Sequence, residues 1–385
     1  MFLRTDLDLI FLVLWCAFGG FNVALGASVG KHDENTLQMI SAIFRHGDRS
    51  PVYTYPNDPY LNYNWPGGLG SLSRKGVGQL YNLGKNLRHR YGHLLPKDGR
   101  YTQNNMFVRS SYAERCIMSA QSLLAGFMPP HKDSNPLPIE WQPVPITTVP
   151  KYEDELLSQY RRCKKYDNSL AEIRKNPPSD LKKMNEDNKD LYELLTKQTG
   201  KNITTFTDIE QLYDVLKIQR DNQLILPDWT EDIFPARMLP FAQRDYSIFT
   251  ETPYMKKIKG GAFITEVYNT MTKKHTRTLK PDRKMFFYAA HDLTLVGILN
   301  SLGVLSQAAL LPEYSAVIVF ELHTNRAMGN DLEVKLSYYP NSATAEPREL
   351  TLPNCSSPCS FPMFGAAVKD LLIDDDFDSI CENFQ

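Results

Sequence analysis

The feature that most constrains this chain is an apolar, strand-like run that ends abruptly in a cluster of charge. Residues 39–44 are apolar except for Ser41, and the heptapeptide Arg45-His46-Gly47-Asp48-Arg49-Ser50-Pro51 follows directly. Guanidinium groups are planar, permanently charged and bidentate, so they suit phosphate oxygens. A neutral imidazole can attack phosphorus. The pattern therefore predicts a phosphate pocket at the end of a buried strand, with His46 as the nucleophile.

Two more strand-like runs end in polar residues just before a helical segment. Residues 286–290 lead into His291 and Asp292, and residues 105–109 lead into a polar turn that reaches Arg115. Taken alone, Asp292 fits a helix cap and Arg115 fits an ordinary surface arginine. Beside the heptapeptide, His291 becomes a candidate ligand for phosphate oxygen and Asp292 a candidate proton donor to a leaving oxygen.

The periodicity of apolar residues predicts an α/β fold. We expect strands at 38–44, 105–109, 284–290, 316–322 and 332–338, and helices at 73–91, 115–127 and 293–302. Strands that alternate with helices favour a mixed, mainly parallel sheet flanked by helices. The last two strands are predicted to form an antiparallel hairpin at the edge of this sheet. The buried face of the first helix is expected to consist of Val77, Leu80, Leu83, Gly84 and Leu87.

The middle of the chain differs in character from its two flanks. Residues 152–245 are rich in charge and in helix formers, and residues 208–220 carry apolar side chains at helical spacing. We therefore expect an α-helical cap at 152–245, inserted between two parts of one α/β domain at 28–151 and 246–385. Such caps often shape substrate choice, because ligands enter at the carboxyl ends of sheet strands. A solvated helical layer without a functional role is the alternative.

The N-terminus carries the pattern of a secretory signal. An apolar stretch at 7–18 precedes small residues at 24–27, which predicts a signal peptide over residues 1–27 and a secreted protein. An N-terminal membrane anchor is the alternative, and we expect no stable membrane anchor elsewhere. The sequons at Asn202 and Asn354 would be glycosylation sites in that pathway. With 43 basic and 44 acidic residues, the chain gives no reason to expect nucleic-acid binding.

These motifs resemble those of the histidine acid phosphatases, within the phosphoglycerate-mutase-like superfamily. The heptapeptide matches the R-H-G-x-R-x-P signature of that family, and His291-Asp292 matches its distal His-Asp pair. The segment from Val108 to Arg115 resembles the one that supplies the third arginine of the family. The resemblance runs from about Leu37 to Cys381. It is strongest to secreted insect venom-type enzymes and to prostatic and lysosomal acid phosphatases.

The resemblance implies a two-step hydrolysis of phosphate monoesters, small-molecule or phosphoprotein, with no cofactor and no metal. His46 would form a phosphohistidine, and Asp292 would protonate the leaving oxygen. The groups expected to hold the phosphate are Arg45, Arg49, Arg115 and His291. The family likeness also implies a homodimer and a secreted or lysosomal location.

The resemblance further implies disulfides between Cys163 and Cys381 and between Cys355 and Cys359. Cys116 then remains as a free thiol, which we interpret as a small buried hydrophobe. The pair His89 and His93 has zinc-like spacing but lacks a third ligand, so we expect surface histidines there. In the heptapeptide, the residues assigned to shaping the loop are Asp48, Ser50 and Pro51.

Three other functions stay open on the sequence. A phytase-like inositol polyphosphate phosphatase would share the heptapeptide but need additional basic residues, for which the cap offers Arg161, Arg162, Lys164 and Lys165. A phosphoglycerate mutase is disfavoured, because export removes it from glycolytic substrate. A secreted, non-catalytic binding protein on the same fold is disfavoured by the intact set of charged and imidazole side chains.

Overall fold

The computed structural model describes residues 36–131, 133, 135, 137–329, 331–374 and 376–382. The predicted signal peptide at residues 1–27 lies outside this range. Across the described residues, no helix combines the length and the apolar character needed to cross a bilayer.

One mixed sheet organises the described part of the chain, with the strand order β3-β2-β4-β1-β5-β6-β7. The first four strands in chain order are β1 (Leu37–Arg45), β2 (Met106–Ser110), β3 (Thr147–Thr148) and β4 (Met285–Ala290), and their pairings are all parallel. The remaining strands, β5 (Val317–Asn325), β6 (Asp331–Tyr339) and β7 (Arg348–Leu350), add on by antiparallel pairing. β1 is central and almost wholly buried, as expected for a strand that is covered on both faces.

The predicted α/β fold with a mixed sheet is confirmed, and each predicted strand is present with ends shifted by a few residues. β5 and β6 form the predicted antiparallel hairpin. The hairpin is not the edge of the sheet, however, because β7 pairs with the outer side of β6. β7 and β3 are three and two residues long, too short to show an alternating apolar pattern.

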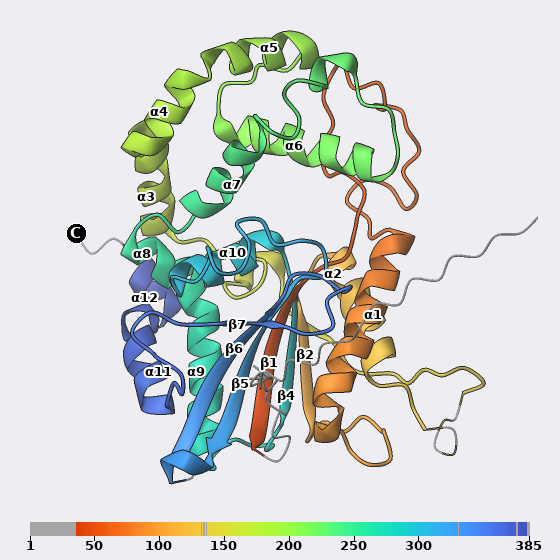
Figure 1. Cartoon of the computed structure of the whole chain (residues 1–385), viewed down its shortest axis with the longest axis vertical. Coiled ribbons are helices and arrows are strands. Elements are labelled where there is room, and N and C mark those ends of the chain that lie inside the picture. Colours follow the sequence, from red (N-terminus) through yellow and green to blue (C-terminus); the bar gives the residue numbers. More distant parts are fainter. Residues whose placement is uncertain are drawn as a thin grey trace, which may run out of the picture. The chain divides into compact units, whose positions relative to one another are not determined.

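Helices cover both faces of the sheet, as Figure 1 shows. α1 (Arg74–Tyr91) and α2 (Glu114–Phe127) pack on one face with a cluster of apolar side chains from β1, β2 and β4. On the other face, α9 (Ala262–His275), α10 (Asp292–Ser301) and α11 (Phe361–Val368) enclose a second apolar cluster. The short helices α8 (Pro253–Lys256) and α12 (Phe377–Cys381) lie at the margin of this face.

The contact between α1 and α2 depends on glycine at the crossing point. A Cβ atom on Gly84 would lie 2.1 Å from the carbonyl oxygen of Leu123, and one on Gly126 equally close to Tyr81. The expected buried face of α1 is correct for Leu80, Leu83, Gly84 and Leu87. It is wrong for Val77, which is 40% exposed. The first turn of α1 packs through Gly76 instead, whose Cα lies against the backbone of Asp48.

A layer of helices lies over the carboxyl ends of the parallel strands (Figure 1). Its members are α3 (Lys164–Lys175), α4 (Ser179–Asp187), α5 (Lys189–Thr199), α6 (Phe206–Asp221) and α7 (Leu239–Ile248). The layer has its own apolar cluster, in which the predicted stripe Leu212, Val215 and Leu216 of α6 is buried. The cluster also takes in Tyr55 from the loop after β1, and α7 continues past residue 245. The cap boundaries at 152 and 245 therefore stay predictions.

Both expected disulfides are present. Cys163, directly before α3, is bonded to Cys381 at the end of α12 across 218 residues, and Cys355 is bonded to Cys359. Cys116 is a free, buried cysteine, as predicted. The long-range bond connects the first cap helix to the C-terminal helix, so it restricts the unfolded chain strongly.

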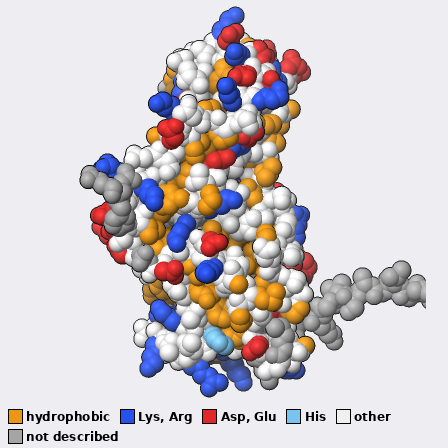
Figure 2. Space-filling model, turned by 90° about the vertical axis from the view of Figure 1, so that its left-hand side faces the viewer, with side chains coloured by type: hydrophobic (Ala, Val, Ile, Leu, Met, Phe, Trp, Pro, Cys, Tyr) orange, Lys and Arg blue, Asp and Glu red, His pale blue; other side chains and the backbone are white. Residues whose placement is uncertain are grey.

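The surface carries charges of both signs. Figure 2 shows Lys and Arg side chains interspersed with Asp and Glu over one face of the molecule, around scattered apolar side chains. This distribution agrees with the formal net charge of −1.

A buried carboxylate in β5 connects the sheet to α1. The carboxylate of Glu321 accepts hydrogen bonds from Tyr91 Oη at 2.5 Å and from Ser337 Oγ at 3.2 Å. His323 Nε2 lies 2.9 Å from its second oxygen. Burial would raise the pKa of Glu321, but the hydrogen bond from His323 and the charge of Arg90 lower it to about 2.

We predict that Glu321→Gln destabilises the fold in a pH-dependent way. Because the pKa falls from an ordinary 4.5 to about 2 on folding, the ionised carboxylate stabilises the folded state by up to about 3 kcal/mol above pH 4.5. This stabilisation is lost as the pH falls from about 4.5 towards 2. Urea unfolding at pH 7 should show the full difference, and at pH 4 a smaller one. Glu349→Gln, at an exposed position of β7, is the control, and a pH-independent difference would contradict the argument.

Candidate active site

The parallel register brings the three polar junctions of the sequence to one edge of the sheet. Arg45 pairs with Ala290 across β1 and β4, and Ser110 pairs with Ala289 across β2 and β4. Each strand therefore ends at the same level, and the residues that follow enter the same space. The backbone N–H of His46 donates to Ala290, and that of Ser111 donates to Ala289.

His46 lies in the floor of this space and is 1% exposed. Its Nδ1 is 2.9 Å from the carbonyl oxygen of Gly47. A carbonyl can only accept, so Nδ1 carries the proton and the lone pair is on Nε2. Burial, followed by the charges of Arg115 and Arg45, lowers the pKa of His46 well below 6.5. The side chain is therefore a neutral imidazole with its Nε2 available as a nucleophile.

Three other members of the heptapeptide, Gly47, Asp48 and Ser50, fix the loop, and the sequence predicted this role for Asp48 and Ser50. A Cβ atom on Gly47 would lie 2.5 Å from the carbonyl oxygen of Gly76, so only glycine lets this loop touch α1. Ser73 Oγ, the cap of α1, donates to the carboxylate of Asp48 at 2.5 Å. Ser50 Oγ donates to the carbonyl oxygen of Gly68 at 2.6 Å. The acidic Asp48 is thus held at the start of α1.

Arg45 is the last residue of β1 and pairs with Asp292 at the start of α10. Its Nη2 lies 2.5 Å from Asp292 Oδ2, and its Nη1 donates to the carbonyl oxygen of Pro312 at 2.7 Å. The guanidinium also stacks on Tyr314, 4.2 Å from the ring centroid. Burial opposes ionisation of Asp292, but the charge of Arg45 outweighs it and lowers the pKa of the carboxyl. Asp292 is therefore an ionised carboxylate in this structure.

Arg115 and His291 lie together beside His46. The His46 and His291 rings are 5.7 Å apart between centroids, and Arg115 Nη2 is 3.4 Å from His291 Nδ1. Arginine has no acceptor, so Nδ1 of His291 accepts and Nε2 carries the proton. That proton is donated to Ser111 Oγ at 2.9 Å. Burial and the charge of Arg115 lower the pKa of His291 to about 3, which keeps the ring neutral.

Cys116 packs under the His291 ring, with its sulfur 3.7 Å from Nε2. Burial raises the pKa of this thiol to about 11. The side chain is therefore an uncharged thiol that fills space beneath the ring, which agrees with the role of a small buried hydrophobe.

Three guanidinium groups at this edge have a buried Nε–H with no hydrogen-bond partner among the described residues. They belong to Arg45, Arg49 and Arg115, whose charges all act on His46. Arg109 also has such an Nε–H, but its guanidinium pairs with Asp154. Buried donors are nearly always paired, so a group of unpaired ones indicates a ligand that supplies acceptors. Charged donors are costly to leave unpaired, so an oxyanion is the matching chemistry. The structure thus brings together all six site residues predicted from sequence: Arg45, His46, Arg49, Arg115, His291 and Asp292.

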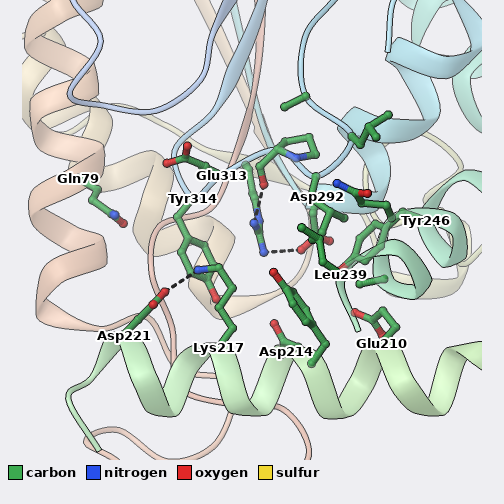
Figure 3. Close-up of a pocket in the computed structure, with 18 of the residues that line it drawn as sticks. Gln79, Glu210, Asp214, Lys217, Asp221, Leu239, Tyr246, Asp292, Glu313 and Tyr314 are labelled. Carbon is green, nitrogen blue, oxygen red and sulfur yellow. Dashed lines mark hydrogen bonds and ion pairs between the residues drawn. The ribbon is translucent and has the colours of Figure 1, made fainter. Parts of the chain in front are cut away.

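A cavity of about 460 Å³ opens beside Arg45 and Asp292. Figure 3 shows Glu210, Asp214, Lys217 and Asp221 rising from one helix, α6, towards it. Tyr246 and Leu239 of α7, Gln79 of α1, and Tyr314 contribute further walls. Burial and the charge of Asp214 raise the pKa of Glu210 well above 4.5.

The polar stripe of α6, formed by Glu210, Asp214, Lys217 and Asp221, was not predicted from the sequence. Its members follow one another at intervals of three or four residues, on one face of the helix. The signal was present in the sequence, opposite the apolar stripe of the same helix. A charged helix face normally indicates only contact with solvent, so periodicity alone does not distinguish it from a cavity wall.

Comparisons with known proteins identify the family of the chain. Residues 36–338 match the family model of the histidine phosphatase superfamily (branch 2). The chain is 31% identical over 370 residues to prostatic acid phosphatase of Rattus norvegicus, covering 94% of this chain and 93% of the relative. It is 32% identical over 337 residues to lysosomal acid phosphatase of Rattus norvegicus, covering 86% and 76%. A phytase of Hafnia alvei in complex with tartrate matches with a TM-score of 0.67 and 18% identity, covering 90% and 98%.

The chain therefore belongs to the histidine phosphatase superfamily, in its branch 2. This membership places it among the enzymes, as a phosphoric monoester hydrolase. The likeness to the phytase, at 18% identity, establishes the fold alone.

We predict that the neutral state of His291 makes the fold less stable in acid. The unfolded chain takes up a proton near pH 6.5, whereas folded His291 does so only near 3. The free energy of unfolding should therefore fall as the pH drops below 6.5, by about 2 kcal/mol at pH 5 from this residue. Urea unfolding at pH 7 and pH 5 of wild type and His291→Asn measures it, because the variant should lose about 2 kcal/mol less. His89→Asn, at an exposed position, is the control, and equal losses in wild type and His291→Asn would contradict the prediction.

Proposed function

We propose that this protein is an acid phosphatase that hydrolyses phosphate monoesters through a phosphohistidine at His46. The observation that supports this most is the combination of a buried, neutral His46 with three guanidinium groups whose buried Nε–H donors have no partner in the described part of the chain. A phosphate group offers acceptors for these donors and an electrophilic phosphorus for Nε2 of His46. Acid phosphatase relatives at 31–32% identity support the same assignment.

In the first step, Nε2 of His46 attacks phosphorus and the bond from phosphorus to the ester oxygen breaks. The positive charges of Arg45, Arg49 and Arg115 stabilise the charge on the phosphoryl oxygens in the transition state. The departing oxygen takes a proton from Asp292 and leaves as an alcohol. Asp292 suits this role because it opens onto the cavity next to Arg45.

Asp292 must gain a proton before it can donate one. Without ligand its carboxylate pairs with Arg45. A bound phosphate monoester competes for the Arg45 charge and, below about pH 6, brings a second proton of its own. The competition for Arg45 raises the pKa of Asp292 in the complex. The second proton of the ester can pass to Asp292, so acidic conditions favour the reaction.

In the second step, a water molecule attacks the phosphohistidine. Its oxygen bonds to phosphorus, the bond to Nε2 breaks, and Asp292 accepts the water proton. Inorganic phosphate and neutral His46 result, and Asp292 is again protonated for the next cycle.

We predict that His46→Ala abolishes phosphate ester hydrolysis. The variant lacks the nucleophile but keeps the arginines, so it should still bind inorganic phosphate. Hydrolysis of p-nitrophenyl phosphate at pH 5, and trapping of an acid-labile phosphoenzyme by rapid quenching, measure the two consequences. His93→Ala, outside the site, serves as the matched control. Wild-type turnover in His46→Ala, or a phosphoenzyme on another residue, would disprove the mechanism.

The cavity favours esters with a single phosphate over phytate-like substrates. Its acidic lining residues are Glu210, Asp214, Asp221, Asp292 and Glu313, against Arg45, Lys75 and Lys217 as basic ones. Lys217 Nζ donates a hydrogen bond to Asp221 Oδ2 at 2.5 Å, and Arg45 forms an ion pair with Asp292. The basic cap residues that the sequence offered for polyphosphate binding do not line the cavity; Arg161, for example, pairs with Asp378. Additional phosphates on a substrate would therefore meet more acidic groups than basic ones, and two of the three basic groups are already paired with carboxylates.

We predict that kcat/KM at pH 5 is at least about tenfold higher for p-nitrophenyl phosphate than for phytate. Repulsion between the additional phosphates and the cavity carboxylates is expected to cost at least about 1.4 kcal/mol. Asp221→Asn removes one carboxylate and releases Lys217. The variant should therefore show a smaller ratio of kcat/KM for p-nitrophenyl phosphate to kcat/KM for phytate. Equal efficiency on both substrates would instead favour the phytase-like function.

Secretion, glycosylation and a homodimer also belong to this proposal. Two disulfides support passage through an oxidising compartment, outside the cell or in the lysosome. Asn202 and Asn354 are both exposed, which glycosylation requires. A non-catalytic binding protein is disfavoured, because binding alone does not need a neutral nucleophile next to a carboxyl group.

A further inference from the structure

One arginine of the heptapeptide is held by a carboxylate from the cap. Arg49 Nη1 donates to Asp214 Oδ2 at 3.0 Å, and Nη2 donates to Oδ1 at 3.2 Å. This is the parallel, two-bond geometry in which a guanidinium and a carboxylate match best. The Arg49 and Asp214 side chains are only 7% and 13% exposed. Burial disfavours the charge of Arg49, but Asp214 outweighs it and raises the pKa of Arg49 well above its ordinary value.

The pairing leaves one edge of Arg49 without a protein partner. Besides Asp214, Nη1 contacts the carbonyl oxygen of Ser50 at 3.2 Å, whereas the buried Nε–H has no partner among the described residues. Arg45 shows the same division. Its Nη atoms contact Pro312 and Asp292, and no described residue accepts a hydrogen bond from its Nε–H. Both guanidinium groups are thus held at the Nη end by acceptors of the protein.

We propose that Asp214 is a positioning residue of the phosphate site. It holds the Nη end of Arg49 and thereby leaves the Nε–H edge directed to a phosphate oxygen. Asp214 acts through Arg49 and does not contact phosphate itself. This role rests on the proposed phosphatase function. It means that the cap helix α6 orients a phosphate-binding residue in addition to lining the cavity.

The competing explanation is an ordinary ion pair that supplies a counter-charge. The cap contains such a pair in Asp190 and Arg237, where Nη2 contacts both carboxylate oxygens at 3.0 and 2.9 Å. Those side chains are 67% and 35% exposed and do not line the cavity. A pair of this kind contributes at most about 1 kcal/mol. The two explanations differ in what removal of the Asp214 charge does to phosphate binding.

A counter-charge competes with phosphate for Arg49, so its removal should tighten phosphate binding. A positioning group orients Arg49, so its removal should weaken catalysis without any gain in phosphate affinity. Misplacement of a clamp by about 1 Å costs up to about 100-fold in rate. The Asp214→Asn variant separates these outcomes because amide and carboxylate have the same shape.

The experiment compares wild type, Asp214→Asn and Asp214→Glu with p-nitrophenyl phosphate at pH 5. Positioning predicts a loss of about 10- to 100-fold in kcat/KM for Asp214→Asn, with an inhibition constant for inorganic phosphate that is unchanged or higher. Asp214→Glu keeps the charge but shifts the carboxylate by one methylene, so it should recover only part of the activity. Asp190→Asn is the matched control and should stay within about twofold of wild type.

Three results would overturn the proposal. One is wild-type kcat/KM in Asp214→Asn, and another is tighter inhibition of that variant by phosphate. The third is full wild-type activity in Asp214→Glu, which decides the matter if Asp214→Asn does not fold, as circular dichroism would report. An inactive wild-type protein would instead contradict the proposed phosphatase function. An active wild type with an unaffected Asp214→Asn would contradict only the role of Asp214.

Discussion

The burial of several guanidinium groups around one neutral imidazole is the constraint on which the rest of this structure depends. Charges that are taken out of water need partners, and the chain supplies them from distant elements: Asp292 for Arg45 and Asp214 for Arg49. Burial and, after it, these charges lower the pKa of His46, so the imidazole stays neutral. One arrangement therefore produces a positive pocket, keeps the imidazole of His46 unprotonated and places the carboxyl group of Asp292 beside Arg45.

The backbone makes this arrangement possible. Parallel pairing of β1, β4 and β2 ends three strands at one level, so the loops that follow meet without long connections. Gly47 lets the loop that follows β1 lie directly on α1, where a Cβ atom would collide with the backbone of Gly76. Gly84 and Gly126 bring α1 and α2 together on the same side of the sheet. Glycine is thus used where backbone must touch backbone, and charge is concentrated where strands end.

Much of the fold and most of the site could be predicted from sequence, for identifiable reasons. Long apolar runs such as β1 and β4 are covered on both faces, so they stand out from their surroundings. β3 and β7 were missed because two or three residues carry no period, and Val77 was misplaced because the first turn of α1 packs through Gly76. Arg115 and His291 follow strand-like runs, which made them candidates, but ordinary surface or cap roles fit the same positions, so the family resemblance was needed to assign them to the phosphate. The stripe of α6 that carries Asp214 and Glu210 looked like any solvated helix face.

The sequence by itself determined which groups reach the candidate site: an imidazole between two arginines, a distal His-Asp pair, and the strands and helices that carry them. This was possible because each of these features consists of residues that are close together in the sequence, where their spacing can be recognised. Tertiary structure alone decided which charges neutralise one another, which imidazole nitrogen carries a proton, and that a cap carboxylate holds Arg49. These properties depend on contacts between residues as far apart as Arg49 and Asp214, and on burial that changes the energy of a charge. Neither these contacts nor this burial exists until the chain has folded.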